Sequence, residues 1–167
     1  MSELVPAGKR VGPSRQQLQV SDQNQYVSIT IGGQLFGIPV LIVHDVLGPQ
    51  RITRIPLAPP EVAGSLNLRG RIVTAIDVRL RLGLPKRDVG DDTAMSVVVE
   101  HGGEFYSLMV DAVGEVLMLS TAEFERNPAT LDPRWRDVSL GIYRLDAELL
   151  VILDVLRLLD FSRNEAA

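Results

Sequence analysis

The chain has 167 residues, of which 46% are apolar and 23% charged, and its formal net charge is −4. This charge gives no general attraction to nucleic acid or to an anionic membrane, and no apolar run is long enough to span a bilayer. The absence of cysteine excludes disulfides, thiolate metal sites and cysteine nucleophiles, and it is compatible with a reducing cytosol.

The N-terminal part of the chain indicates a tail followed by short strands. Residues 1–24 are rich in Gly, Pro, Ser and Gln and follow no strand or helix period, so we expect a flexible tail without a secretory signal. Residues 26–31 alternate as a half-buried strand, and a Gly-Gly pair closes a turn before a second β-rich stretch, residues 35–47, bent near Pro39. Residues 51–60 contain three prolines and predict an extended connector.

A hairpin and a short helix complete this first series of elements. Residues 66–76 predict a hairpin that turns at Arg69-Gly70. Asp77 then has the position of an N-cap for a short helix over residues 78–82. Residues 85–93 are rich in charged residues and contain Pro85 and Gly90, which is typical of a linker.

The second half of the chain repeats the first. Val27–Leu47 aligns without gaps with Val97–Leu117, and Gly64–Leu82 aligns with Gly141–Leu159. The identical positions include both glycines of the turn and the aspartate before the short helix. We therefore infer two copies of one unit, made of a strand, a Gly-Gly turn, a long strand, a connector, a hairpin and a short helix.

The repeat predicts the fold class. Each copy has about five strands, which suits a small closed barrel without exposed sheet edges. We expect an all-β fold of two five-stranded barrels packed on each other across an apolar seam, with short helices that include a C-terminal one. The expected boundaries are about residues 25–84 for the first barrel and 94–161 for the second, with a C-terminal tail at residues 162–167. Whether the two barrels exchange elements is left open.

The two hairpins differ where their polar residues lie. The first reads Asn67-Leu68-Arg69-Gly70-Arg71 and the second reads Arg144-Leu145-Asp146-Ala147-Glu148, so only the leucine is kept. Because the barrel can be built without them, Asn67, Arg69 and Gly70 are candidates for recognition, although drift in a turn gives the same pattern. An acid stands before Val46 and before its counterpart in the second copy, but only the first copy has an arginine at its turn. We expect Asp45 to pair with Arg69 and to fix the pose of the arginine.

No pattern of residues indicates catalysis or metal binding. His44 and His101 are far apart in the sequence, and neither has a further ligand at metal-site spacing. The glycine pairs lack the lysine and the following helix of a phosphate loop, and no G-x-S-x-G motif occurs. We therefore expect no catalytic residue, no metal and no cofactor.

One basic cluster raises the alternative of nucleic-acid binding. Small barrels that bind nucleic acid stack its bases on aromatic side chains, but no aromatic residue lies between Leu66 and Asp92. This favours a charged surface that docks proteins over a nucleic-acid site, which remains the alternative from a different class. The cluster consists of Arg69, Arg71, Arg79, Arg81, Lys86 and Arg87.

Several motifs together resemble the CheW family of chemotaxis coupling proteins. The resemblance covers about residues 25–161, and the N-L-R-G hairpin in this context is its most specific part. Two pairs of residues depart from the family: Thr74-Ala75 stands where proline and a β-branched residue are common, and His44-Asp45 stands where a longer acid is frequent. The matching motifs are Phe36-Gly37-Ile38-Pro39-Val40, Val43-His44-Asp45-Val46, Ile55-Pro56, Gly64-Ser65-Leu66-Asn67-Leu68-Arg69-Gly70, Val110–Leu117 and Leu150–Asp154.

The resemblance implies a fold and a set of partners. It implies two SH3-like barrels with a groove between them, and a cytoplasmic adaptor without enzymatic activity. The implied partners are the cytoplasmic tip of chemoreceptors, which would recruit the chain to arrays at the inner membrane, and the regulatory domain of a CheA-type histidine kinase.

The resemblance also implies which residues meet each partner. On the receptor side it implies Val43, Asp45, Val46, Gly64, Asn67, Leu68, Arg69 and Gly70, with Val110 and Val113 on the second barrel's wall of the groove. On the kinase side it implies Val27, Val40 and again Val43. A CheW-like module of a larger kinase, or of a kinase–receptor array with an output other than motility, is the nearest alternative reading.

Overall fold

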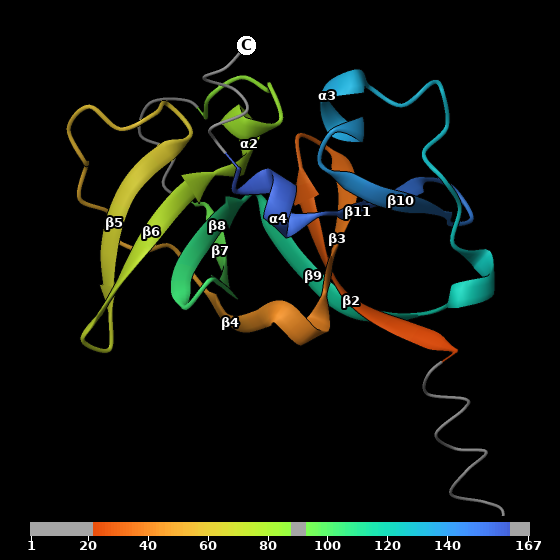
Figure 1. The fold of residues 1–167 in the computed structure, drawn as a ribbon, viewed down its shortest axis with the longest axis horizontal. Helices are drawn as coiled ribbons and strands as arrows, with labels where there is room; N and C mark the ends of the chain where they lie inside the picture. The colour runs from red at the N-terminus through yellow and green to blue at the C-terminus, as the bar shows by residue number, and fades with distance from the viewer. Residues whose placement is uncertain (1–21, 88–92, 161–167) are drawn as a thin grey trace, which may run out of the picture.

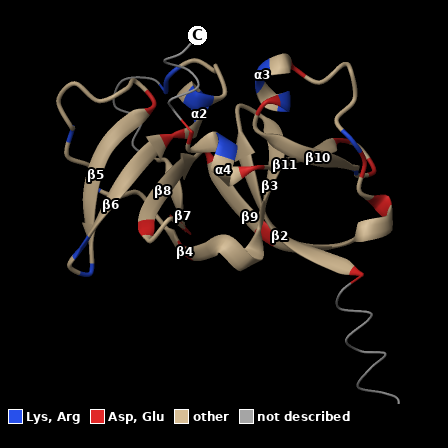
Figure 2. Ribbon diagram, in the orientation of Figure 1, with Lys and Arg blue, Asp and Glu red and all other residues tan. Residues whose placement is uncertain are grey.

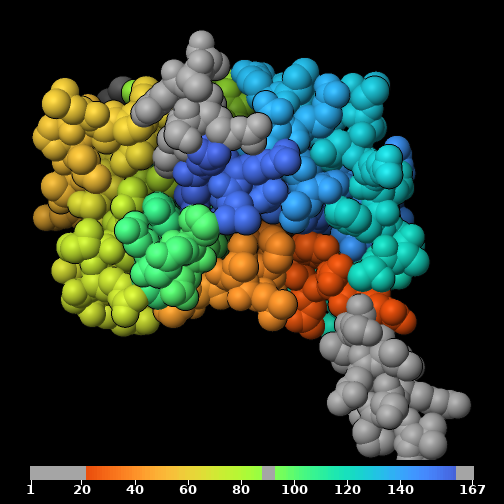
Figure 3. All heavy atoms as spheres, viewed as in Figure 1, coloured from red at the N-terminus to blue at the C-terminus, as the bar shows by residue number. Residues whose placement is uncertain are grey.

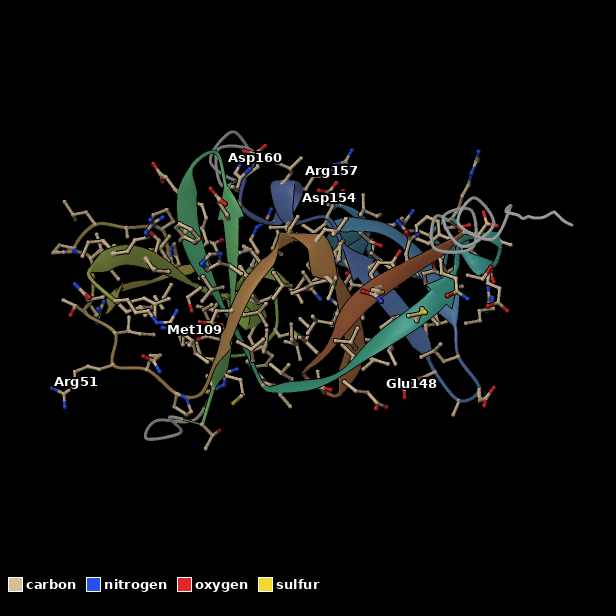
Figure 4. All side chains as sticks on the ribbon, turned by 90° about the horizontal axis from the view of Figure 1, so that it is seen from below. Arg51, Met109, Glu148, Asp154, Arg157 and Asp160 are labelled. Atoms are coloured by element: carbon tan, nitrogen blue, oxygen red, sulfur yellow. The ribbon has the colours of Figure 1, made fainter. Side chains whose placement is uncertain are left out.

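The computed structural model describes residues 22–87 and 93–160 as two five-stranded β-sheets with short helices at their ends (Figure 1). Figure 4 shows the two sheets side by side from below, with Arg51 beside one sheet and Glu148 beside the other. The predicted tails lie almost wholly outside the described residues. Gln23 and Asn24, which the sequence assigned to the tail, already belong to the first strand.

The first sheet has the strand order β10-β11-β3-β2-β9. Neighbouring strands are antiparallel except β11 and β3, which are parallel. Its strands are β2 (Gln23–Ile31), β3 (Gln34–Pro39), β9 (Ala112–Ser120), β10 (Ser139–Arg144) and β11 (Leu149–Leu153).

The second sheet has the order β4-β7-β8-β6-β5, again with one parallel pair, β6 and β8. Read from β5, this is the order of the first sheet with each strand replaced by its counterpart in the other repeat, which supports the inferred duplication. The all-β prediction with two SH3-like barrels is confirmed. The strands are β4 (Val43–Leu47), β5 (Val62–Leu68), β6 (Arg71–Asp77), β7 (Met95–His101) and β8 (Glu104–Val110).

Each sheet contains strands from both repeats. The stretch predicted as one bent strand is two strands, because β3 ends at Pro39 and the 3₁₀ turn η1 (Val40–Ile42) carries the chain into the other sheet, where β4 begins. In the second repeat, the chain makes the same crossing at Asp111, between β8 and β9. The barrels are therefore not contiguous halves of the chain: β2 and β3 complete the sheet of β9–β11, and β7 and β8 complete the sheet of β4–β6.

Short helices follow the last strand of each repeat, as predicted. Asp77 caps α2 (Val78–Arg81) by accepting a hydrogen bond from the backbone N–H of Leu80, and Asp154 caps α4 (Val155–Leu158) in the same way. The segment between β9 and β10, which corresponds to the connector of the first repeat, adds η2 (Thr121–Glu123) and α3 (Pro133–Arg136). Helices of one turn are not stable alone, so contacts with the barrels must hold them.

Three apolar clusters make up the interior. One lies within the second sheet and includes Leu66, Val73 and Ala75; another lies within the first sheet and includes their counterparts, Tyr143, Leu150 and Ile152. The largest cluster is shared by both sheets, so the two barrels are joined by a common core. Its fully buried members include Ile29, Phe36, Ile38, Ile76, Val97, Val99, Leu108, Val110, Ile142 and Val151.

A buried glycine at an equivalent position of each repeat lets the connector cross the hairpin. Gly64 has a φ of 151° and Gly141 a φ of 156°. A Cβ on Gly64 would lie 2.1 Å from the carbonyl oxygen of Thr53, whose backbone pairs with Ser65. A Cβ on Gly141 would meet the ring of Phe124 and the carbonyl oxygen of Glu125. The identity of these two glycines in both copies therefore follows from packing.

We expect Gly64→Ala to lower the free energy of unfolding by at least ~2 kcal/mol, because the added methyl group meets backbone and the backbone conformation disfavours a side chain. Urea denaturation followed by circular dichroism measures this change. Gly48→Ala is the matched control, since no atom lies within 4 Å of the Cβ it would add. Equal stability of the two variants would contradict the close approach of the connector backbone at Thr53 to Gly64.

Candidate protein-docking surfaces

The first candidate surface is the tip of the β5–β6 hairpin. Arg69 and Gly70 form its two-residue turn with φ values of 52° and 82°, which is the backbone of a type I′ turn. The side-chain oxygen of Asn67 accepts a hydrogen bond of 2.9 Å from the backbone N–H of Gly70. Asn67 and Gly70 therefore shape this turn, whereas the sequence comparison favoured recognition over architecture for both.

The predicted pair between Asp45 and Arg69 is present. Nη2 of Arg69 lies 3.3 Å from Oδ2 of Asp45, and the arginine side chain is 77% exposed. The other oxygen of Asp45 accepts a hydrogen bond from the backbone N–H of Val46. Because the arginine is largely exposed and the aspartate partly so, the pair contributes on the order of 0–1 kcal/mol to stability, so its effect is to orient the guanidinium.

The valines assigned by resemblance divide into buried and half-buried residues. Val110 has no exposed surface and Val27 is also buried, so neither can contact a partner directly. Both valines pack in the core that the two barrels share. Gly64 is also buried, beneath the connector, which excludes it from the receptor-side surface. Val40, Val43 and Val113 are half-buried at the edge of the core and keep part of their side chains accessible, while Val46 is exposed.

The second candidate surface is an apolar groove of about 1070 Å³ beside the first strand. Leu41, at the middle of η1, is 95% exposed, and Met118 on β9 is 58% exposed. In Figure 3, the orange atoms around residue 40 lie on the lower side, between the green β7–β8 hairpin and the red start of β2. The groove is lined by residues 22–26 and by Pro39, Val40, Leu41, Met118, Ser120, Phe124, Leu140 and Ile152.

Leu41 and Met118 were not among the residues that the sequence predicted for a docking surface. The sequence did contain a signal for an exposed apolar side chain on this strand. Residues 116–119 are all apolar, whereas a strand with one solvated face normally alternates between apolar and polar residues. Val116 and Met118 point to the exposed face, and Leu117 and Leu119 pack against the core of the first sheet. Leu41 lies in a one-turn element without periodicity, so no pattern marked it.

Three of the six residues of the predicted basic cluster are engaged in contacts inside the protein. Asp111, at the second crossing, accepts hydrogen bonds from Arg79 at 2.7 Å, from Arg87 at 2.6 Å and from the backbone N–H of Gly32 at 2.7 Å. Arg81 donates to the carbonyl oxygens of Arg157 and Leu158 at the end of α4, both at 2.8 Å. The cluster therefore does not form one charged docking face, because Arg79, Arg81 and Arg87 bind groups within the protein.

The described titratable groups with clear pKa shifts have structural explanations. Burial raises the pKa of Tyr26, whose hydroxyl lies 3.5 Å from that of Tyr143. Hydrogen bonds from Arg134 lower the pKa of Asp132. Residues 22–87 and 93–160 contain no group of three or more His, Asp or Glu residues that could hold a metal ion. Within the same ranges, no helix has the length and apolar character to cross a membrane.

We expect Asp111→Ala to lower the free energy of unfolding by ~2 kcal/mol, because it leaves two largely buried guanidinium groups without their acceptor. Glu125→Ala is the control, since the pair of Glu125 with Arg144 is exposed on both sides and should contribute less than ~1 kcal/mol. Thermal and urea unfolding of the two variants measure the difference. Comparable small losses in both would contradict a structural role for the Asp111 network.

Comparison with known proteins supports one family. The model of the CheW-like domain matches residues 25–163. The chain is 26% identical over 155 residues to a chemotaxis protein CheW of Helicobacter pylori, an alignment that covers 93% of each chain. It is 27% identical over 150 residues to a chemotaxis protein CheW of Bacillus subtilis, covering 89% of this chain and 95% of the other.

A solved structure agrees with these sequence matches. The crystal structure of the scaffolding protein TtCheW from Thermoanaerobacter tengcongensis superimposes with a TM-score of 0.69 at 32% identity. The superposition covers 78% of this chain and 88% of that one. With the family model spanning most of the sequence, the chain belongs to the CheW-like family, whose members are non-catalytic chemotaxis adaptors.

Proposed function

We propose that this chemotaxis adaptor couples the cytoplasmic tip of a chemoreceptor to the regulatory domain of a CheA-type histidine kinase in the cytoplasm. The two partners would occupy different surfaces, the receptor at the β5–β6 hairpin and the kinase at the groove beside β2. Family membership supports an adaptor role, and the two exposed surfaces support two separate partners. Receptor binding would recruit the chain to arrays at the inner membrane.

The observation that carries the receptor assignment is the exposed guanidinium of Arg69 on a defined turn. Arg69 has a positive φ, a conformation that Asn, Asp or Gly adopts more readily. The turn conformation does not require an arginine at this position, so we attribute the choice of arginine to a role of its side chain in binding. Asp45 holds it from β4, and Asn67 holds the backbone beneath it. Val43, Val46, Leu68 and Val113 are the remaining proposed receptor-side residues.

The kinase assignment is supported by exposed apolar side chains. Val40 and Leu41 project from η1 into the groove, and Met118 reaches it from β9. Exposed apolar side chains gathered at one groove are typical of protein-docking sites. Val43 follows η1 as the first residue of β4 and is half-buried at the edge of the core, whereas Val27 lies within the core.

We expect Arg69→Glu to weaken binding of a receptor cytoplasmic fragment about tenfold or more, because it reverses the oriented charge. The melting curve should stay unchanged, since the exposed pair contributes little stability. Titration calorimetry measures binding, and circular dichroism checks the fold.

The double variant Asp45→Arg with Arg69→Glu tests the pairing directly. Restoring an opposite-charge pair should recover part of the binding if orientation matters. Binding of the double variant at the level of the single reversal would end the pairing hypothesis, and an unfolded Arg69→Glu would make the residue structural.

We expect Leu41→Asp to lower the affinity for the kinase regulatory domain about tenfold while leaving receptor binding unchanged, because it places a charge in an apolar contact. Leu156→Asp is the matched control, since Leu156 is an exposed leucine on α4, outside the groove. Surface plasmon resonance with immobilised kinase domain measures both variants. Equal affinities of the two variants would show that the kinase does not bind at the groove.

A further inference from the structure

A second arginine of the hairpin, Arg71, is held by an aromatic ring. Its guanidinium carbon lies 4.3 Å from the ring centroid of Phe105, which is a buried residue of β8. On β4, the ring of His44 meets the same phenyl ring edge-on, with centroids 4.6 Å apart. The hairpin and β4 are thus connected through Phe105, beside the Asp45–Arg69 pair.

This contact differs from those of the other arginines in the cluster. Arg69, Arg79 and Arg87 each pair with a carboxylate. Within the described residues, Arg71 forms no ion pair and no side-chain hydrogen bond, although its side chain is exposed. A cation–π contact fixes the plane of a guanidinium without occupying its N–H groups, so all the donors of Arg71 remain available.

The surroundings of Arg71 fit an acidic partner. Figure 2 shows the tip of the β5–β6 hairpin in blue, where Arg69 and Arg71 flank Gly70 and Arg69 pairs with Asp45. Ile72, the next residue, is 67% exposed, and Val46 is exposed on β4. The surface therefore combines two guanidinium groups with apolar side chains, which complements a segment bearing carboxylates next to apolar residues.

We propose that Arg71 is a second recognition residue that binds a carboxylate of the partner, and that Phe105 and His44 are positioning residues that hold its guanidinium ready. This inference rests on the proposed function in that the hairpin is the receptor-side surface. Because a planar guanidinium binds a carboxylate through two parallel hydrogen bonds, a fixed plane favours binding. Ordering the side chain before the partner arrives also removes an entropic cost of association.

Binding of the receptor fragment tests the role of Arg71. We expect Arg71→Gln to weaken binding about tenfold at low salt, with a smaller effect at high salt, where charge interactions are screened. Arg71→Lys should recover only part of the affinity, since an ammonium lacks the planar fork. Arg126→Gln is the matched control, because it removes an exposed arginine from the other barrel. Equal affinities for Arg71→Gln and Arg126→Gln would overturn the proposal.

Nuclear magnetic resonance of the arginine side chains tests the positioning without any partner. In the unmodified protein, the Nε–H proton of Arg71 should be shifted upfield by the ring current of Phe105. Phe105→Leu should abolish this shift and weaken receptor binding, whereas Phe105→Tyr, which keeps the ring, should preserve both. A resonance of Arg71 at its free position in the folded protein would overturn the positioning role, even if Phe105→Leu proved unstable.

The outcomes separate this inference from the function on which it rests. Loss of binding in Arg69→Glu but not in Arg71→Gln would leave the receptor assignment standing and refute the second arginine. If the unmodified protein does not bind the receptor fragment, the receptor assignment fails. A helical peptide with glutamates one turn apart, titrated into the same sample, then decides about Arg71. A shift of the Nε–H resonance of Arg71 with this peptide, but not with a peptide that has glutamines in place of the glutamates, would support carboxylate binding by Arg71. The absence of a shift would refute carboxylate binding by Arg71.

Discussion

The crossing of the chain between two sheets, once in each repeat, is the constraint on which the rest of the structure depends. The first crossing passes through η1 and the second through Asp111, so every sheet needs strands from both halves of the sequence. Neither repeat can complete a barrel by itself in this arrangement. The shared apolar cluster and the Asp111 network then join the two barrels into one body.

This constraint has a consequence for an adaptor. The hairpin carrying Arg69 is on the second sheet, and the groove beside Leu41 is on the first, but η1 leads from the groove directly into β4, which carries Asp45. Partners at the two surfaces would thus be held in a fixed relation by this short continuous segment and by the core that the two barrels share, rather than by a long linker. A scaffold functions by fixing the positions of its partners relative to each other, so its fold must keep the two binding surfaces in a rigid arrangement.

Local chemistry made part of the structure predictable from the sequence. The turn at Arg69-Gly70, the caps at Asp77 and Asp154 and the pairing of Asp45 with Arg69 each depend on residues whose type and spacing carry the information. Strand exchange could not be predicted, because alternation indicates which face is buried and not which sheet a strand joins. The burial of Val27 and Val110 agrees with this alternation, and only the resemblance had assigned the two valines to partner surfaces. The use of Arg79, Arg81 and Arg87 inside the protein depends on contacts between segments distant in sequence, which spacing does not reveal.

Division of the chain within residues 88–92 tests the exchange of strands most directly. The two fragments would be produced separately, and their circular dichroism and the fluorescence of Trp135 recorded before and after mixing. Exchange predicts that neither fragment shows a cooperative melt alone, and that mixing restores the β spectrum and native fluorescence with one melting transition. A fragment that folds cooperatively by itself, with no change on mixing, would contradict exchange and the single rigid framework that follows from it.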